Sequence, residues 1–338
     1  MADEVKALMC AKLLRVGLSE KHAQTISSCL TETSLYGIDT HGIRLFSYYV
    51  KELEQGRANR SPEFVYSRES AVSGLLDADN ANGIIAGVEG MRYCVAKCKT
   101  VGLSAVVVNN SNHFGAASTF SRLAAKEKLI GISLSNSDAL VALEGGCRPF
   151  LGTNPIAVSI PGAEGAKFDL DFATSQTAYS KVMKYLAEGT SLPSGWALDE
   201  QGNDSVNSQK VHALMPLGGY KGQGLGLMVQ MLTCVLAGMP FDHQLDHLYS
   251  PPYDSPRKIA HFFIAIDPSL FMDAEQYGER VKELLFWAKE NTPNAILPGE
   301  KEMNAQKKRD IEGIPLSEEE QYYFEMLRKE VNCLVSKN

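Results

Sequence analysis

A single histidine lies where an apolar run of this sequence gives way to polar and small residues. In "VVVNNSNHFGAAS", residues 106–118, β-branched residues precede His113 and residues that can open a helix follow it. The end of a strand before a helix is where α/β sheets place side chains over a ligand. An imidazole that titrates near neutral pH suits proton transfer. The residues alone predict either a proton-transfer group or a histidine whose hydrogen bonds are satisfied by the turn.

A glycine cluster surrounds a lysine in "PLGGYKGQGLGLM", residues 216–228. Its glycines do not have the spacing of the G-x-G-x-x-G dinucleotide motif or of a P-loop. Glycine is tolerated where a backbone turns tightly or approaches a ligand. Lys221, just ahead of an apolar helix, is electrostatically unfavourable unless an anion lies nearby. The segment therefore predicts either an anion site or a glycine-rich turn with a solvated lysine.

Several shorter polar motifs are ambiguous by themselves. "DFATS" (171–175) and "GTNP" (152–155) have the residue types of ordinary turns and caps. "DTHG" (39–42) is expected to end the second helix, where the helix dipole favours a histidine. "HQLDH" (243–247) has zinc-ligand spacing, but it lies in a predicted loop without the metalloprotease glutamate or a nearby cysteine. We therefore predict no metal site, and the absence of G-x-S-x-G argues against a Ser-His-Asp hydrolase.

Hydrophobic periodicity predicts an α/β fold with helices at both ends of the chain. Helical spacing begins at residue 2, and Ser19 is the expected N-cap of a second helix. Helices are also expected at 273–290 and 317–335. Short apolar runs predict strands at 103–110, 130–136, 155–161, 167–174 and 259–267. Some connections, such as "PGAEGA", are too short for a crossover helix and favour antiparallel pairing in a mixed sheet.

Composition excludes several classes of protein. The 338 residues are 44% apolar and 22% charged, with a net charge of -7 and scattered Lys and Arg, so we expect no nucleic-acid partner. The seven cysteines and a start without secretory-signal features favour the reducing cytoplasm. The apolar segment 225–240 is interrupted by Gln230 and Thr233 and is too short to span a bilayer. It predicts a buried helix and no membrane partner.

Nine motifs in order give the chain a family resemblance: "GIDTHGI", "NNSNHFGA", "SNSD", "GTNPIA", "DFATS", "LPSGWALDEQGN", "PLGGYKGQGLGLM", "LAGMPF" and "LPGE". From about residue 30 to about residue 315, the chain resembles the type-2 malate/L-lactate dehydrogenases, a family that includes ureidoglycolate and sulfolactate dehydrogenases and some imine reductases. The resemblance implies a non-Rossmann NAD(P)-binding fold with a largely antiparallel sheet. It also implies a helical domain built from both termini, and a homodimer whose active site lies near the subunit interface.

The resemblance also implies roles for individual residues. His113 matches the family's acid/base histidine, and Lys221 matches a lysine at the cofactor and substrate end of the site. The implied substrate-binding residues are His41, Arg44, Asn154 and Arg257, and the implied cofactor-binding residues are Ser137, Asp171, Phe172, Ala173, Lys221, Gly299 and Glu300. One departure concerns Arg44, which is three residues after His41, whereas the family's arginine is usually four residues after that histidine and Leu45 stands there.

The sequence therefore predicts an NAD(P)-dependent 2-hydroxy acid dehydrogenase, with L-malate as the first substrate to consider because the site offers several cations. The cofactor is NAD or NADP, with NAD preferred. L-Lactate, ureidoglycolate, sulfolactate or a cyclic imine are alternative substrates, and a noncatalytic dinucleotide-binding relative is a more distant alternative. We expect residues 1–70 and 272–338 to form the helical domain and residues 71–271 to form the NAD(P)-binding and catalytic domain.

Overall fold

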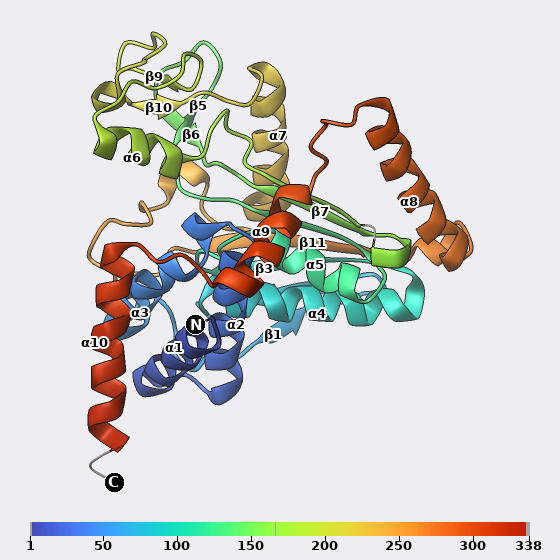
Figure 1. The fold of residues 1–338 in the computed structure, drawn as a ribbon, viewed down its shortest axis with the longest axis horizontal. Coiled ribbons are helices and arrows are strands. Elements are labelled where there is room, and N and C mark those ends of the chain that lie inside the picture. The colour runs from blue at the N-terminus through green and yellow to red at the C-terminus, as the bar shows by residue number, and fades with distance from the viewer. Residues whose placement is uncertain (1, 166, 336–338) are drawn as a thin grey trace.

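A seven-stranded mixed sheet organises the protein (Figure 1), whose computed structural model describes residues 2–165 and 167–335. Its strands are β1 (Val65–Ser67), β2 (Ser73–Asp77), β3 (Leu103–Ser111), β4 (Ile130–Ser135), β7 (Ile156–Pro161), β8 (Lys167–Phe172) and β11 (Ile259–Ile266). They lie in the order β1-β2-β3-β11-β4-β7-β8, and only β2 and β3 pair in parallel. The predicted mixed, largely antiparallel fold is confirmed, including the antiparallel pairing of β7 with β8 across the short "PGAEGA" turn.

A second, smaller sheet contains β5 (Val141–Ala142), β6 (Pro149–Leu151), β9 (Ala197–Leu198) and β10 (Ala213–Leu214), in the order β6-β5-β10-β9. Helix α6 (Tyr179–Glu188) contributes Val182 to its apolar cluster, beside Val141, Leu151 and Leu214. In Figure 1 this layer lies above the large sheet, and helix α7 (Tyr220–Gln230) reaches between the two.

Helices cover both faces of the large sheet because its central strands are apolar on both sides. On β11, Phe262 packs with Val229 of α7, whereas the next residue, Phe263, faces Phe120 on the opposite side. That opposite face is covered by α4 (Gly83–Val101) and α5 (Ser118–Lys126). Gly90 lets α4 approach closely, since a Cβ there would lie 2.8 Å from Cγ2 of Val108.

The expectation of a buried helix at 225–240 is wrong for the single chain. Helix α7 continues as a π-helical stretch, Met231–Val235, and one side of the whole segment packs on the sheet. The other side is exposed: Met231 is 58% exposed, Val235 53% and Leu236 56%. Apolar composition does not reveal which side of a helix has a neighbour within the same chain.

The remaining helices come from the two ends of the chain: α1 (Ala2–Val16), α2 (Glu20–Leu35), α3 (Phe46–Gln55), α8 (Ala274–Asn291), α9 (Glu300–Glu312) and α10 (Glu318–Val335). Ser19 caps α2 as predicted, its hydroxyl accepting from the His22 amide at 3.3 Å. Helix α10 packs on α1 and α9 on α2, whereas α8 extends away toward the β7–β8 turn (Figure 1). The N-terminal helices share one apolar core with the large sheet. The two-domain boundary stays a prediction.

The "DTHG" segment does not end the second helix, contrary to expectation. Helix α2 stops at Leu35, and Gly37 (φ +80°) turns the chain before a separate 3-10 turn over Asp39–His41. Arg309 of α9 holds this turn, donating from Nη2 to Oδ2 of Asp39 at 2.9 Å. The position of His41 therefore depends on both ends of the chain.

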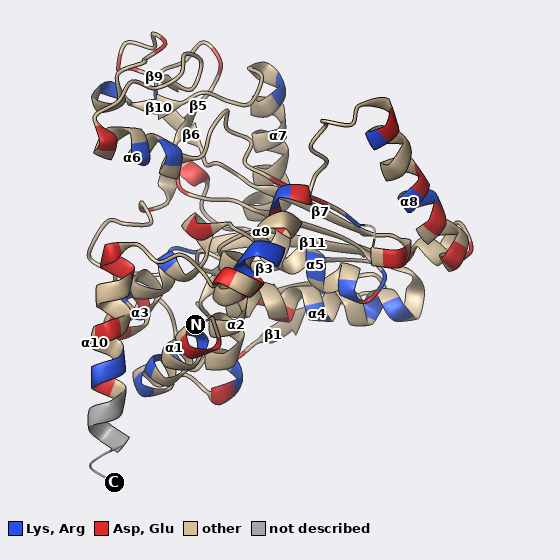
Figure 2. Cartoon of the chain, viewed as in Figure 1, with Lys and Arg blue, Asp and Glu red and all other residues tan. Residues whose placement is uncertain are grey.

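Charged residues of both signs are interspersed over the helices, as Figure 2 shows for α8 and α9. This distribution agrees with the scattered Lys and Arg of the sequence. Within the two described ranges, none of the helices combines the length and apolar character needed to cross a membrane.

Candidate active site

His113 lies at the corner predicted for it, directly after β3 and before α5. Its ring is half-buried, and Nδ1 lies 2.9 Å from the hydroxyl of Tyr49. Tyr49 is fully buried in α3, whose apolar side packs into the main core. Burial, and secondarily the charge of Glu52, raise the pKa of Tyr49 well above its usual value, so the phenol stays protonated. The contact leaves Nε2 of His113 as the nitrogen without a protein partner among the described residues.

The surroundings of His113 favour the neutral imidazole. Burial lowers its pKa well below the usual value, and the neighbouring His41, Arg257 and His261 lower it further. The His41 ring lies 5.9 Å from that of His113, centroid to centroid, and its Nδ1 is 2.9 Å from the Thr40 hydroxyl. Burial also lowers the pKa of His41, although the charge of Asp171 partly opposes this. The structure therefore brings His41 and His113 together, as the sequence predicted for one site.

Arg257 is the permanent cation whose charge acts on His113. Its side chain is fully buried, and its Nη2 donates to Oδ1 of Asp138 and, at 2.9 Å, to the carbonyl of Asp246. Nε also donates to the Asp246 carbonyl, at 3.2 Å, whereas Nη1 is buried and has no hydrogen-bond partner. A buried guanidinium nitrogen without a partner is costly, and an anionic ligand would satisfy it.

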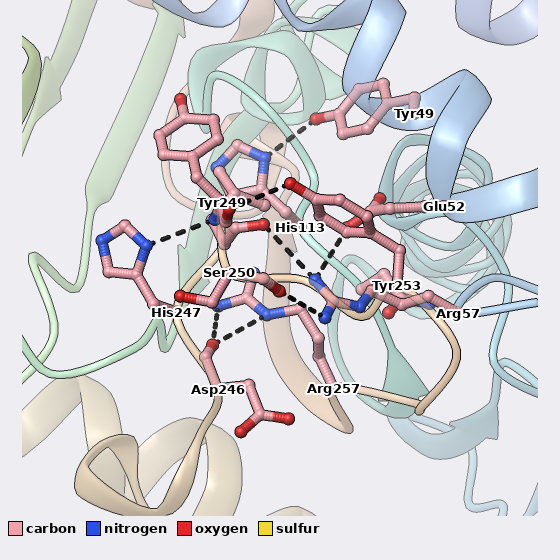
Figure 3. Close-up of polar contacts among 12 residues, drawn as sticks. Tyr49, Glu52, Arg57, His113, Asp246, His247, Tyr249, Ser250, Tyr253 and Arg257 are labelled. Carbon is pink, nitrogen blue, oxygen red and sulfur yellow. Dashed lines mark hydrogen bonds and ion pairs between the residues drawn. The ribbon is translucent and has the colours of Figure 1, made fainter. Parts of the chain in front are cut away.

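The loop that carries Arg257 is held to the rest of the protein by a second buried arginine (Figure 3). Arg57 donates to the carbonyls of Leu248 at 3.3 Å, Ser250 at 3.1 Å and Pro252 at 2.8 Å. Its guanidinium also lies over the Tyr253 ring, 4.7 Å from the centroid. Arg57 thereby fixes the path of residues 246–257 beside His113.

Glu52 is the buried counter-charge of these arginines. It lies one turn after Tyr49 on α3, and its Oε1 is 3.8 Å from Nη1 of Arg57. Neither carboxylate oxygen has a hydrogen-bond partner. Burial raises the pKa of Glu52 to about 7, while the charges of Arg257 and Arg57 oppose the increase. Helix α3 thus carries both Tyr49, which contacts His113, and Glu52, which pairs with Arg57.

The predicted cofactor residues at the end of β8 lie on the outer edge of the large sheet. The Asp169 amide points outward and donates to the Pro298 carbonyl at 3.3 Å, so the alternation of the strand also directs the backbone groups of Asp171 outward. Gly299 packs against the same strand, because a Cβ there would lie 2.9 Å from Cβ of Asp169. The structure thus brings Gly299 to the strand that holds Asp171 and Phe172 and that ends just before Ala173.

Asp171 and Glu300 have well-defined partners. Oδ2 of Asp171 accepts from the Ser118 amide at the start of α5, at 2.9 Å, and the buried Ser118 hydroxyl has no partner. Glu300 pairs with Lys289 at 2.6 Å and accepts from the Leu297 amide at 3.1 Å. The interactions of Glu300 shape the "LPGE" turn.

Ser137 and Asn154 belong to one buried network. Oδ1 of Asn154 accepts from the Ser137 amide at 3.2 Å, and its Nδ2 donates to Gly226 O at 3.1 Å and to Oδ2 of Asp242 at 2.8 Å. The Ser137 hydroxyl accepts from the Thr153 amide at 3.1 Å. Since both hydrogens of the Asn154 amide are used within the chain, its visible role is to hold the 137, 154 and α7 segments together.

Two predicted residues lie apart from His113 in the single chain. Lys221 is exposed in the first turn of α7, and no ion pair or hydrogen bond joins it to another residue of the described ranges. Arg44 is half exposed, and its Nε lies 3.3 Å from Oε1 of Glu320 on α10. Leu45, which stands at the family's usual arginine position, is buried in the core. The substrate role of Arg44 and the catalytic role of Lys221 stay predictions.

Four residues of this region were not predicted from the sequence: Tyr49, Asp138, Glu52 and Arg57. Asp138 follows Ser137 in the quoted "SNSD" motif, so a carboxylate near a predicted arginine site was visible. Arg57 gives no local signal, because the carbonyls it binds are more than 190 residues away in the sequence.

Comparison with known proteins identifies the family. The sequence profile described as "Malate/L-lactate dehydrogenase" matches residues 1–324. The chain belongs to the malate/L-lactate dehydrogenase family. This makes it an NAD(P)-dependent dehydrogenase of the 2-hydroxy acid class, and the resemblance inferred from the nine motifs is confirmed.

Family members with different substrates are similarly close to this dehydrogenase. It is 32% identical over 318 residues to ureidoglycolate dehydrogenase (NAD(+)) of Escherichia coli, which covers 93% of this chain and 91% of that protein. It is 32% identical to malate dehydrogenase of Pyrococcus horikoshii, over 84% and 80% of the two chains. The solved sulfolactate dehydrogenase of Methanocaldococcus jannaschii superposes with a TM-score of 0.91 at 30% identity, over 98% and 96%. Sequence similarity to family members therefore leaves the substrate open.

Proposed function

We propose that this dehydrogenase interconverts a 2-hydroxy acid and the corresponding 2-oxo acid, with His113 as the acid/base and Arg257 as the partner of the substrate carboxylate. The proposal depends on one observation: two neighbouring side chains, His113 and Arg257, each have a nitrogen without a hydrogen-bond partner. Nε2 of His113 is free while Nδ1 contacts Tyr49, and Arg257, whose charge reaches His113, has the buried Nη1 without a partner.

The Tyr49 contact supports a proton-transfer role for His113. When Nδ1–H donates to the Tyr49 oxygen, Nε2 has a lone pair that can accept the proton of the substrate hydroxyl. In the reverse direction, protonated Nε2 donates to the oxygen that develops at C2. A bound carboxylate would offset the charge of Arg257 and so raise the pKa of His113 toward the range in which it donates.

The outer edge of β8 fits a dinucleotide. NAD(P) supplies the hydride acceptor and donor at the nicotinamide ring. The outward backbone groups of Asp171 can hold a carboxamide, and the unpartnered Ser118 hydroxyl is a further polar group beside it. Asp171, Phe172, Ala173, Gly299 and Ser137 would line the binding position. We propose NAD rather than NADP. The relatives use both: the E. coli protein is named for NAD(+), and a Chromohalobacter sulfolactate dehydrogenase is named for NADP(+).

Two substrate pairs are candidates within this class. L-Malate and oxaloacetate are the pair predicted from the sequence, and the two Pyrococcus relatives are malate dehydrogenases. A monocarboxylic pair such as L-lactate and pyruvate is favoured by one observation: Arg44, the second proposed carboxylate partner, pairs with Glu320.

We further propose a homodimer. Met231, Val235 and Leu236 on the segment after α7 expose an apolar surface, and α8 exposes Leu284 (69%) and Trp287 (59%). Apolar surface of this kind is typical of a subunit interface. Size-exclusion chromatography with light scattering tests it, and a monomer at micromolar concentration would contradict it.

The function is tested by absorbance at 340 nm with purified protein, NADH or NADPH, and oxaloacetate or pyruvate. We expect substrate-dependent loss of absorbance with at least one oxo acid, abolished in His113→Ala. A panel covers the relatives' substrates: ureidoglycolate and sulfolactate are supplied with NAD+ or NADP+, where absorbance at 340 nm would increase, and a cyclic imine is supplied with NADH or NADPH. If the protein binds a dinucleotide but turns over none of these, the acid/base proposal is wrong.

A further inference from the structure

The charge of Arg257 is already largely matched within the protein. Its Nη2 pairs with Asp138, and the Asp246 carbonyl accepts from both Nη2 and Nε, which leaves Nη1 alone to meet a ligand. Asp138 is itself buried, with 7% of its surface exposed. A second substrate carboxylate near Arg257 would therefore be repelled by Asp138 as well as attracted by Arg257.

His247 lies near the other carboxylate oxygen of Asp138. Its Nε2 lies 3.8 Å from Oδ2 of Asp138, and its Nδ1 accepts from the Tyr249 amide at 3.2 Å. Since Nδ1 is the acceptor, the neutral ring carries its hydrogen on Nε2, which faces Asp138. Asp138 thus contacts Arg257 through one oxygen and lies near His247 through the other.

The other cationic side chains considered for this site either pair with other groups of the protein or are exposed. Arg44 pairs with Glu320, and the buried Leu45 next to it brings no charge. Arg57 donates to three loop carbonyls and lies beside Glu52. Its Nε is buried without a partner, but Arg57 is not among the charges that act on His113. Lys221 is exposed in the first turn of α7. Within residues 2–165 and 167–335, Arg257 alone therefore offers a free cationic donor beside His113.

Uncharged rings surround the Asp138–His247 pair. Tyr249 lies 4.5 Å from Tyr48 and 5.8 Å from His247, and Tyr179 is 5.9 Å from His247, measured between ring centroids. Burial, then the neighbouring Tyr48 and Asp138, raise the pKa of Tyr249 to about 12, so its phenol carries no charge at neutral pH. A substrate group directed to this side meets aromatic faces and hydroxyls.

We infer that the substrate of this site has a single carboxylate and an uncharged substituent at C3, and that Asp138 is the residue that disfavours a second carboxylate. The inference rests on the proposed function, since it assumes that Arg257 receives the carboxylate of the 2-hydroxy or 2-oxo acid. It favours the monocarboxylic pair over L-malate and oxaloacetate.

The test compares two four-carbon oxo acids, 2-oxobutyrate with one carboxylate and oxaloacetate with two, by kcat/KM in the wild-type protein and in Asp138→Asn. We expect 2-oxobutyrate to be at least about tenfold better in the wild type. Asp138→Asn keeps the shape and an acceptor but removes the charge, so we expect the ratio to shift about tenfold toward oxaloacetate. A wild-type preference for oxaloacetate, or an unchanged ratio in a folded Asp138→Asn, would overturn the inference.

A second variant covers the case in which Asp138→Asn does not fold. His247→Arg adds a permanent charge beside Asp138 at a partly exposed position, and His243→Arg adds the same charge on the same loop, where His243 instead stacks on Phe150. We expect only His247→Arg to improve oxaloacetate relative to 2-oxobutyrate. Equal effects of the two variants would contradict a role for Asp138.

Binding measurements separate this inference from the proposed function. Calorimetry with butyrate and succinate, in the presence of the dinucleotide, reports carboxylate selectivity without turnover, and we expect butyrate to bind more tightly. No turnover of any oxo acid would contradict the proposed function, whereas tighter binding of succinate would contradict the single-carboxylate site.

Discussion

The hydroxyl of Tyr49 lies 2.9 Å from Nδ1 of His113 and joins a residue of α3 to a corner 64 positions later in the chain. The contact gives the imidazole a defined orientation and assigns different tasks to its two nitrogens. One nitrogen is held by the protein, and the other has no partner among the described residues, which leaves it available for the proposed proton transfer.

Tyr49→Phe keeps the buried ring but removes the hydrogen bond. We expect kcat to fall by about tenfold to a hundredfold because the imidazole loses its orientation, whereas KM for the oxo acid changes little because Arg257 is untouched. Steady-state kinetics measure this. Tyr323→Phe is the matched control, since Tyr323 lies on α10 and packs on Phe46 instead. Wild-type kcat in Tyr49→Phe would show that the contact is not used.

His113→Ala removes the proposed proton carrier. Turnover should fall on the order of 10² to 10⁴-fold in both directions, while dinucleotide affinity, measured by fluorescence titration, should stay within a factor of a few. His243→Ala, an exposed position on the 246–257 side of the molecule, should leave turnover at the wild-type level. Near-normal turnover of a folded His113→Ala would remove this residue from the mechanism.

The depressed pKa of His113 predicts the pH dependence of both directions. Oxidation needs the neutral base, so its kcat/KM should stay level as the pH falls to 6.5 and decline only below that value. Reduction needs the protonated acid, so its kcat/KM should fall as the pH rises through the same depressed pKa. For reduction, the decline of kcat should occur at a higher pH than the decline of kcat/KM. The bound carboxylate offsets the charge of Arg257 and so raises the pKa of His113 in the complex. Initial rates between pH 5 and 9 check this, and an oxidation limb centred at or above 6.5 would contradict it.

The Glu52–Arg57 pair should be strongly coupled in stability. Arg57→Met leaves Glu52 buried without its nearest cation and frees three carbonyls of the 248–252 segment, so we expect a loss of about 3–5 kcal/mol in the free energy of unfolding. Urea denaturation at pH 8 measures it. The double variant Glu52→Gln/Arg57→Met should recover part of the loss, and strict additivity would contradict the coupling.

His261 should make the protein sensitive to acid. It is fully buried between the hydroxyls of Ser111 at 2.8 Å and Ser135 at 2.9 Å, and burial lowers its pKa to about 3. The unfolded chain takes up the proton below pH 6.5, so stability falls with pH between 6.5 and 3 by about 1.4 kcal/mol per unit. His261→Gln should reduce the loss between pH 7 and pH 5 by about 2 kcal/mol in urea denaturation. The same slope in wild type and variant would contradict this.

Local patterns were sufficient for five of the seven strands of the large sheet, β3, β4, β7, β8 and β11, and for the corner that carries His113. The runs at 103–110, 130–136 and 259–267 became β3, β4 and β11, because strands buried on both faces must be apolar throughout. The "DTHG" segment was placed wrongly at the end of a helix because the turn at Gly37 comes earlier and Arg309, from the other end of the chain, holds Asp39. Similarly, the apolar content of 225–240 gave no sign that one side of this helix would be exposed.

The order of motifs and the alternation of apolar residues were enough to establish the family, the sheet and the acid/base candidate, because these depend on residues that are close in sequence. Only the tertiary structure decided which charges act at the site. In the folded chain, Tyr49 contacts His113 and Arg257 pairs with Asp138. Arg44 pairs with Glu320, and Glu52 lies beside Arg57. Arg257 and Asp138 are 119 positions apart, and Arg44 and Glu320 are 276 apart. Electrostatic effects act through distance in space, and spacing along the chain does not reveal that distance.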